Sequence, residues 1–231
     1  MNTLHKFPKT PHLLWLSPQP ARDDKVMALT EAEEFLANPV VVEEKADGAN
    51  LGLSFDKTGR FKAQNRGNFL DGRLTGQWQG LRGWLARHEA SLRHHLPANA
   101  ILFGEWCYAQ HSIGYTRLPD WFVGFDVFDT EGGRFWNTDR RDALLAEVGL
   151  TPIQRIAFGQ FTLGKLRETL SESSSYYDGP LEGLYLRRED EEGLVSRAKI
   201  VRAEFVQGIG EHWSHGPLHA NRIAAIHAAN S

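Results

Sequence analysis

The chain has 231 residues, of which 41% are hydrophobic and 24% are charged, as is ordinary for a soluble globular protein with one large domain or one domain and a small appendage. Its 26 basic and 29 acidic residues give a net charge of −3, so any nucleic-acid-binding surface must be local. A single cysteine, Cys107, excludes an internal disulfide. No apolar run is long enough for a membrane helix, and we expect a cytoplasmic protein.

The first part of the chain is rich in proline. Residues 1–29 contain four prolines around the apolar group Leu13–Leu16, which predicts an irregular arm that docks through its leucines and its tryptophan rather than a regular helix. Thr30 and Glu33 have the spacing of a capping box, so a short helix is expected to follow and to end near Asn38.

A lysine stands at the end of the first predicted strand. The run Val40–Val42 is typical of a buried strand, and the alternation over Leu51–Phe55 is typical of a second strand with one buried face. Asp47–Gly48 predicts a tight turn between the two. Lys45 would therefore be held on a rigid base, as a nucleophilic lysine requires. The alternative is a hairpin lysine that points into water.

Beyond this hairpin, strand and helix patterns follow one another irregularly. Short apolar runs interrupted by one carboxylate predict buried strands, and leucines at helical spacing predict helices. Strands dominate the middle of the chain, which favours an α+β fold over a doubly wound sheet. The expected helices span residues 74–96, 137–148 and 162–172, the expected strands span 61–65, 101–106, 121–128, 181–188 and 193–201, and a mixed tail over 202–231 has a helical pattern near 223–226.

Some strands carry a charged residue where a purely structural strand would be apolar. Glu105, Glu182 and Lys199 are the clearest cases. An isolated buried charge costs several kcal/mol unless it is paired. We therefore expect these side chains to converge on one polar cavity, the alternative for each being an edge position that faces water.

Six segments carry these residues, in the order Lys45-x-Asp47-Gly48-x-Asn50, Asn65-Arg66-Gly67, Phe103-Gly104-Glu105, Phe125-Asp126-Val127, Glu182-Gly183 and Arg197-x-Lys199. This series resembles the ordered motifs of the covalent nucleotidyltransferases, and in particular the ATP-dependent RNA ligases of the RNA ligase 2 branch. The resemblance runs from about Val40 to Ile200. It departs from that branch at Asp47, where a histidine is frequent, and at Arg197, where a lysine is common.

The resemblance implies an α+β nucleotidyltransferase (ATP-grasp-like) domain of mainly antiparallel sheets with flanking helices. It also implies that Lys45 attacks the α-phosphorus of ATP and becomes a lysyl-adenylate while pyrophosphate leaves. Glu43 or Glu44 would read the adenine, and Phe125 would stack on the base. Glu182 would hold Mg²⁺ or Mn²⁺ beside the phosphates.

The remaining roles are implied in the same way. Arg66 and Glu105 would hold the ribose and orient the ends to be joined, and Asn50 would position phosphate or metal-bound water. Arg197 and Lys199 would neutralise the α-phosphate and, as neighbouring cations, depress the pKa of the nucleophile. The expected catalytic residues are Lys45, Arg197 and Lys199, and the expected ATP-binding residues are Glu43, Glu44, Lys45, Asn50, Arg66, Glu105, Phe125, Glu182 and Lys199.

The implied function is an RNA ligase that seals 5′-phosphate and 3′-hydroxyl ends of RNA, and a nicked duplex and a single-stranded break are both left open as substrates. The alternatives are a DNA ligase or another polynucleotide nucleotidyltransferase, and a non-catalytic module that binds nucleotide or nucleic-acid ends. The short stretch after Lys199 leaves no room for an OB-fold, so residues 1–231 are expected to form a single nucleotidyltransferase domain.

Two further patterns concern ligands. Four arginines are candidates for phosphate contact, and so modest a basic surface predicts salt-sensitive RNA binding or dependence on a partner protein in RNA repair. Three histidines near the C-terminus have a spacing that zinc ligands can take, although a solvated tail is the better expectation because no thiolate joins them. The arginines are Arg73, Arg82, Arg87 and Arg93, and the histidines are His212, His215 and His219.

Overall fold

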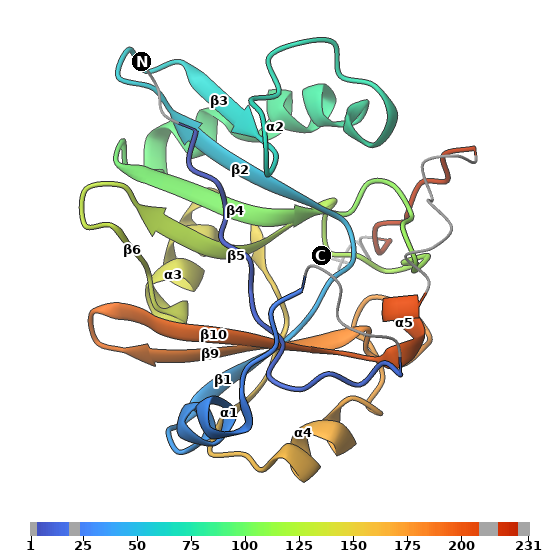
Figure 1. The fold of residues 1–231 in the computed structure, drawn as a ribbon. Helices are drawn as coiled ribbons and strands as arrows, with labels where there is room; N and C mark the ends of the chain where they lie inside the picture. Colours follow the sequence, from blue (N-terminus) through green and yellow to red (C-terminus); the bar gives the residue numbers. More distant parts are fainter. Residues whose placement is uncertain (1–3, 19–23, 208–216, 226–231) are drawn as a thin grey trace, which may run out of the picture.

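The computed structural model describes residues 4–18, 24–207 and 217–225. Two sheets face each other, and the longer helices lie on their outer sides (Figure 1). Within these ranges every strand pair but one is antiparallel, so the predicted α+β fold is confirmed. The first sheet has the order β10 (Gly193–Val201), β9 (Gly183–Asp190), β1 (Val40–Glu44), β8 (Arg155–Gly159), and the second has the order β3 (Phe61–Gln64), β2 (Ala49–Phe55), β4 (Ala100–Trp106), β5 (Phe122–Asp129), β6 (Arg134–Phe135), with β7 (Thr151–Pro152) parallel to β5.

The first sheet has one apolar and one polar face because its strands alternate. Val40 and Val42 lie on the apolar face with Leu184 and Leu186, and this face packs against α1 (Leu29–Leu36) and α4 (Leu163–Thr169). The opposite face turns toward the second sheet. Its polar side chains include Glu43, Tyr185, Arg187, Arg197 and Lys199, which the strand register places side by side.

The second sheet is built in the same way. Its outer face, which includes Leu51 and Trp106, packs against α2 (Leu81–His95) and α3 (Thr138–Val148). The inner face carries Asn50 opposite Glu105 in the register of β2 and β4. Both sheets therefore bury an apolar layer on their outer side, and the inner face of the second sheet adds a smaller apolar cluster, which includes Phe103 and Phe128, beside its polar residues.

The helix boundaries show which local sequence signals determine where a helix begins and ends. The helix predicted from residue 137 forms as expected: Asn137 accepts a hydrogen bond from Arg140 N at 3.0 Å, and Gly149 ends α3 with a φ of 78°. The Thr30 capping box is wrong, because the N-cap of α1 is Ala28, two residues earlier, and the N–H of Ala28 donates to Glu31 at 2.8 Å. The helix predicted from residue 74 begins only at Leu81, after a short 3₁₀ turn at Gly76–Trp78.

Several elements were not predicted. These are the short strands β6, β7 and β8 and the helix α5 (Ala203–Gln207). The helical pattern near residue 223 is wrong, since Ile223 forms an extended bridge with Leu118. None of the helices in the described ranges could span a bilayer.

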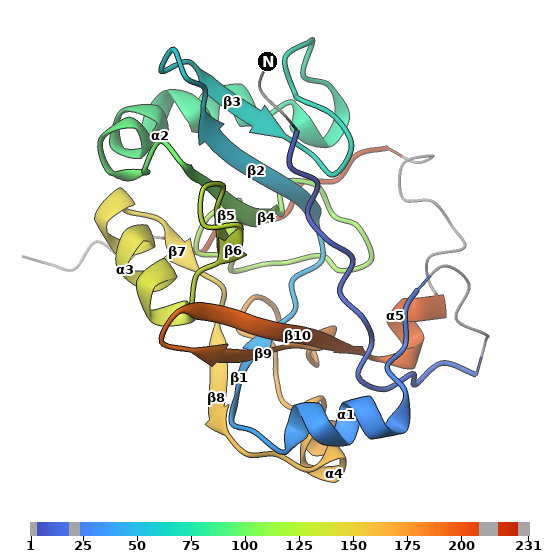
Figure 2. The ribbon, with the colours of Figure 1, turned by 60° about the vertical axis from the view of Figure 1, so that its left-hand side comes forward.

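The N-terminal arm crosses the space between the two sheets (Figures 1 and 2). The carbonyl of His5 accepts a hydrogen bond from Gln64 of β3 at 2.6 Å. Farther along, Lys199 of β10 donates its N–H to Pro11 at 2.9 Å and accepts one from Leu13 at 2.8 Å. Residues 5–13, called here the N-terminal strap, are thus fastened to both sheets.

Candidate functional site

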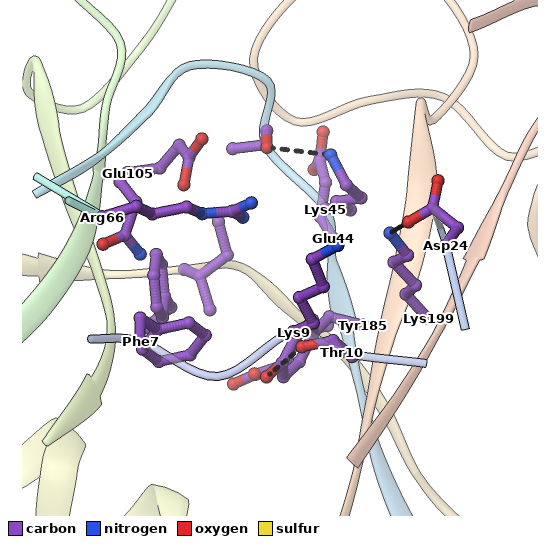
Figure 3. Close-up of a pocket in the computed structure, with 15 residues that line it drawn as sticks. Phe7, Lys9, Thr10, Asp24, Glu44, Lys45, Arg66, Glu105, Tyr185 and Lys199 are labelled. Carbon is purple, nitrogen blue, oxygen red and sulfur yellow. Dashed lines mark hydrogen bonds and ion pairs between the residues drawn. The ribbon is translucent and has the colours of Figure 1, made fainter. Parts of the chain in front are cut away.

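A cavity of about 280 Å³ lies between the polar face of the first sheet, the inner face of the second sheet and the N-terminal strap (Figure 3). The structure brings together most of the residues that the sequence singled out. Phe7, Lys9 and Thr10 of the strap complete the wall, and no sequence motif pointed to them. The predicted residues that line the cavity are Glu43, Glu44, Lys45, Asn50, Arg66, Glu105, Phe125 and Lys199.

Lys45 follows directly after β1, as the sequence predicts. Its backbone N–H donates to Gly183 of β9 at 3.0 Å, and its Nζ donates to Glu182 Oε1 at 2.6 Å and to the carbonyl of Ala46 at 3.4 Å. The side chain keeps 26% of its surface exposed. The amine is therefore fixed at the cavity wall and remains accessible from the cavity.

The pKa of Lys45 is raised, whereas a lowered pKa was expected. Burial by itself lowers the pKa of Lys45, but the attraction of Glu182, Asp47 and Glu105 exceeds it and raises the pKa above its ordinary value. The expectation that neighbouring cations depress this pKa is wrong, because carboxylates surround the amine more closely than cations do.

Two carboxyl groups beside Lys45 share one property. Burial raises the pKa of Glu105 and of Glu182 to about 7, although the positive charge of Lys45 opposes the shift. Glu105 accepts a hydrogen bond from the N–H of Gly48 at 3.1 Å. Glu182 Oε2 is buried and has no hydrogen-bond partner among the residues that the structure describes.

The loop after Lys45 is held by the connection between β4 and β5. The N–H of Asp47 donates to the hydroxyl of Tyr115 at 2.7 Å, and the Asp47 carboxylate accepts from Ser112 N at 2.6 Å. A Cβ at Gly48 would lie 2.6 Å from the carbonyl oxygen of Trp106. Glycine is required here because the backbone of β4 approaches so closely.

Glu43 and Glu44 lie on opposite sides of the first sheet. The carboxylate of Glu44 accepts hydrogen bonds from Ser174 and Ser175 in the loop after α4. The Glu43 side chain is fully buried and receives Arg141 Nη2 at 2.7 Å, while its Oε2 has no partner in the described ranges. Of the two, only Glu43 lies on the face that turns to the second sheet.

Phe125 is held in place by two arginines that no sequence motif indicated. Its carbonyl accepts hydrogen bonds from Arg141 at 2.7 Å and from Arg187 at 3.3 Å. Both arginines are fully buried. The only sequence signal for a buried role was that each arginine, Arg141 in the helix and Arg187 in the strand, stands at an inward position. Phe7 of the strap packs edge-on against Phe125, with ring centroids 5.3 Å apart.

The two basic residues predicted on β10 lie in different surroundings. Lys199 reaches the cavity, where its Nζ donates to Asp24 at 3.0 Å. Arg197 is absent from the cavity lining and donates instead to Asp126 at 3.0 Å and to Tyr185 at 3.1 Å. Burial lowers the pKa of Lys199, and Asp24 opposes the shift.

Asn50 and Arg66 complete the predicted set on the side of the second sheet. Asn50 is buried, and its Oδ1 has no partner within the described residues. Arg66 follows β3 and points into the cavity beside Glu105 in Figure 3. Both therefore offer polar atoms to a ligand.

A divalent metal fits this site only together with a ligand. No group of three histidine, cysteine or acidic side chains in the described part of the chain could hold a metal ion alone. Mg²⁺, however, takes one or two carboxylates and completes its shell with phosphate oxygens and water, and the unpartnered Oε2 of Glu182 suits that role. His212 and His215 lie outside the described residues, whereas the carbonyl of His219 accepts a hydrogen bond from Gln110.

The arginines proposed for RNA contact lie outside the cavity. Arg82 and Arg87 are exposed on α2, and Arg73 is exposed in the loop before it. Arg93 is exposed as well but already pairs with Glu89 at 2.7 Å. These positions leave the nucleic-acid surface a prediction.

The sequence profile described as RNA ligase matches residues 38–201. This range covers all six segments and most of the chain, so the chain belongs to the RNA ligase family. A search of curated protein sequences gave no match.

Solved structures with a similar fold are also RNA ligases. A mutant of the Naegleria gruberi RNA ligase without ligand is 13% identical, with a TM-score of 0.63 over 88% of this chain and 57% of that chain. Another mutant of the same ligase, with ATP and Mn, is 15% identical, with a TM-score of 0.63 over 88% of this chain and 58% of that chain. An archaeal ATP-dependent RNA ligase is 18% identical, with a TM-score of 0.56 over 87% of this chain and 49% of that chain. The chain thus spans about half the length of the structures that it matches.

Proposed function

We propose that this chain is an ATP-dependent RNA ligase that joins a 5′-phosphate to a 3′-hydroxyl through a lysyl-adenylate at Lys45. The observation that carries the proposal is the position of the Lys45 amine, which is fixed in the wall of a polar cavity 2.6 Å from the buried Glu182. Membership of the RNA ligase family and the likeness to ligases solved with ATP support it.

In the first step, Nζ of Lys45 attacks the α-phosphorus of ATP. A phosphorus–nitrogen bond forms, the bond from the α-phosphorus to the bridging oxygen breaks, and pyrophosphate leaves with that electron pair. The amine must lose a proton to attack. Arg66 and Lys199 line the same cavity, where their charges would stabilise the added negative charge on the α-phosphate.

Glu182 links the protonation of the nucleophile to metal binding. Its Oε1 now holds the lysine ammonium, and its Oε2 has no partner in the described chain. A divalent cation such as Mg²⁺ or Mn²⁺ would neutralise phosphate charge and draw Glu182 away from the amine. Without its ion pair, the pKa of Lys45 would fall, which favours the neutral amine.

The base would lie at the end of the cavity formed by Phe125 and Glu43. An aromatic ring supports stacking of a purine, and the unpartnered oxygen of Glu43 is an acceptor that suits an exocyclic amino group. Glu105 and Asn50 would contact the ribose or phosphates. We assign adenine recognition to Glu43 rather than Glu44, because both carboxylate oxygens of Glu44 already accept hydrogen bonds from Ser174 and Ser175.

In the later steps the adenylyl group passes to the 5′-phosphate of the RNA, and the lysine is released. The 3′-hydroxyl then attacks that phosphate, the phosphodiester bond forms and AMP leaves. Arg66, which lines the cavity from the loop after β3, would help to orient these ends.

Intact-mass measurement after incubation with ATP and Mg²⁺ or Mn²⁺ tests the first step. We expect one added AMP in the natural chain and in a Lys57→Ala control, whose lysine lies in an exposed turn, and none in Lys45→Ala. Binding of ATP without an adduct would contradict the proposal and indicate a binding module. Comparing ATP with GTP and NAD as nucleotide donors, and then RNA nicks with DNA nicks as substrates, distinguishes an RNA ligase from a DNA ligase or another nucleotidyltransferase.

A further inference from the structure

The N-terminal strap carries a lysine to the cavity. Phe7 is buried between the sheets, where its ring packs against Phe103 and Phe125. Two residues beyond Lys9, the carbonyl of Pro11 accepts a hydrogen bond from Lys199 N at 2.9 Å. Lys9 therefore lies between two anchored points, which limits the positions that its backbone can take.

The side chain of Lys9 points from the strap into the cavity, toward Lys45 (Figure 3). Its charge also reaches Asp24: burial raises the pKa of Asp24, but Lys199 and, more weakly, His12 and Lys9 lower it overall. Lys9 is thus part of the electrostatic environment of the cavity, although it belongs to neither sheet.

The basic side chains that line the cavity come from different parts of the fold. Lys45 directly follows β1, Lys199 belongs to the edge strand β10, Arg66 follows β3, and Lys9 comes from the strap. ATP has three phosphates. Lys45 must contact the α-phosphorus, so the two outer phosphates need cations of their own. A lysine, as a compact charge on a flexible stem, is suited to a phosphate that departs.

We propose that Lys9 binds the β- and γ-phosphates of ATP, the part that leaves as pyrophosphate. The inference rests on the proposed function and adds a role for the N-terminal strap within it. Lys9 then acts in the transfer of AMP to Lys45, and it has no part in sealing an RNA end that already carries AMP, because no pyrophosphate is present in that step.

The experiment compares Lys9→Ala with Lys6→Ala, an exposed lysine of the same arm that does not line the cavity. We expect Lys9→Ala to raise the ATP concentration for half-maximal adduct formation roughly tenfold, the effect of one charge-assisted contact. Reversal of the adduct by inorganic pyrophosphate should weaken by a similar factor. Sealing of pre-adenylated RNA should stay within twofold of the natural chain, and Lys6→Ala should behave as the natural chain in all assays.

Two results would overturn the inference. Equal adduct formation and equal pyrophosphate reversal in both variants would show that Lys9 does not contact the leaving group. If Lys9→Ala reduced the sealing of pre-adenylated RNA as much as it reduced adduct formation, Lys9 would contact the RNA end or only support the strap. Failure of the proposed function would give a different result, because the natural chain itself would then form no adduct with ATP.

Discussion

At the scale of single residues, the carboxyl groups beside Lys45 have an unusual affinity for protons. Burial raises the pKa of Glu105 to about 7 from an ordinary value of 4.5. Between these two pH values the folded chain holds a proton that the unfolded chain has released. Stability is therefore expected to fall as the pH rises from about 4.5 to 7 and to stay lowered above that range.

Glu105→Gln removes the charge and keeps the shape of the side chain. We expect this variant to gain roughly 2 kcal/mol relative to the natural chain at pH 8, a few degrees in Tm, and to gain far less at pH 5, where Glu105 is already protonated. Thermal unfolding at both pH values measures the difference. An equal shift at pH 5 and pH 8, or the same pattern in the exposed control Glu191→Gln, would contradict the argument.

The residues of the site differ in how well the sequence predicts them. Lys45 was predictable because its neighbours along the chain, a valine run and an Asp-Gly turn, fix its position locally. Lys9 was not, because its place in the cavity depends on hydrogen bonds to Gln64 and Lys199, far away in the sequence. Arg197 had the right motif but is drawn into a buried pair with Asp126. Whether a strand charge faces a cavity or an ion pair depends on tertiary contacts.

At the scale of elements, the loop that carries Asp47 is supported from the C-terminal part of the chain. Tyr115 accepts the N–H of Asp47 through its hydroxyl and donates its own N–H to Asn221 Oδ1 at 2.7 Å. The Asn221 amide also donates to the carbonyl of Cys107 at 2.8 Å. Asn221, in the segment predicted as a mixed tail, thus helps to fix the loop beside Lys45.

Tyr115→Phe removes only the hydroxyl that accepts from Asp47. We expect the rate of adduct formation at saturating ATP to fall roughly tenfold, because a small displacement of the loop misplaces the amine relative to the α-phosphorus. Single-turnover measurement of AMP incorporation tests this expectation. The control is Tyr108→Phe, whose hydroxyl contacts only the exposed side chain of Gln79 among the described residues. Equal rates in the two variants would show that Tyr115 does not position the loop.

Elements with a strong period or clear caps were predictable, and elements that depend on partners were not. The strands β9 and β10 and the helix α3 follow from alternation, a polar turn and caps that lie close in the sequence. β8 has an exposed phenylalanine, Phe158, and is a strand because it pairs with β1. The helix predicted from residue 74 starts late because Gly76 takes a φ of 57°, which interrupts the helix.

At the scale of the whole molecule, buried ion pairs join the two sheets. Arg187 of β9 and Arg197 of β10 both pair with Asp126 of β5, and Glu43 of β1 pairs with Arg141 of α3. Asp126, Glu43, Arg141 and Arg187 are fully buried. Because each pair connects the first sheet to the second sheet or its helix, these contacts set the spacing of the cavity walls.

Asp126→Ala would leave two arginines without their shared carboxylate in the interior. Removing one partner of a buried pair costs about 3–5 kcal/mol, so we expect the Tm to fall by roughly 10 °C. The exposed pair of Arg117 and Asp178, whose aspartate side chain is 93% exposed, provides the control, because Asp178→Ala should change stability little. Thermal and urea unfolding of both variants give the comparison. Similar midpoints for the two would mean that Asp126 does not hold the sheets together, and the cavity would then owe its shape to the apolar contacts of Phe7 and the strap.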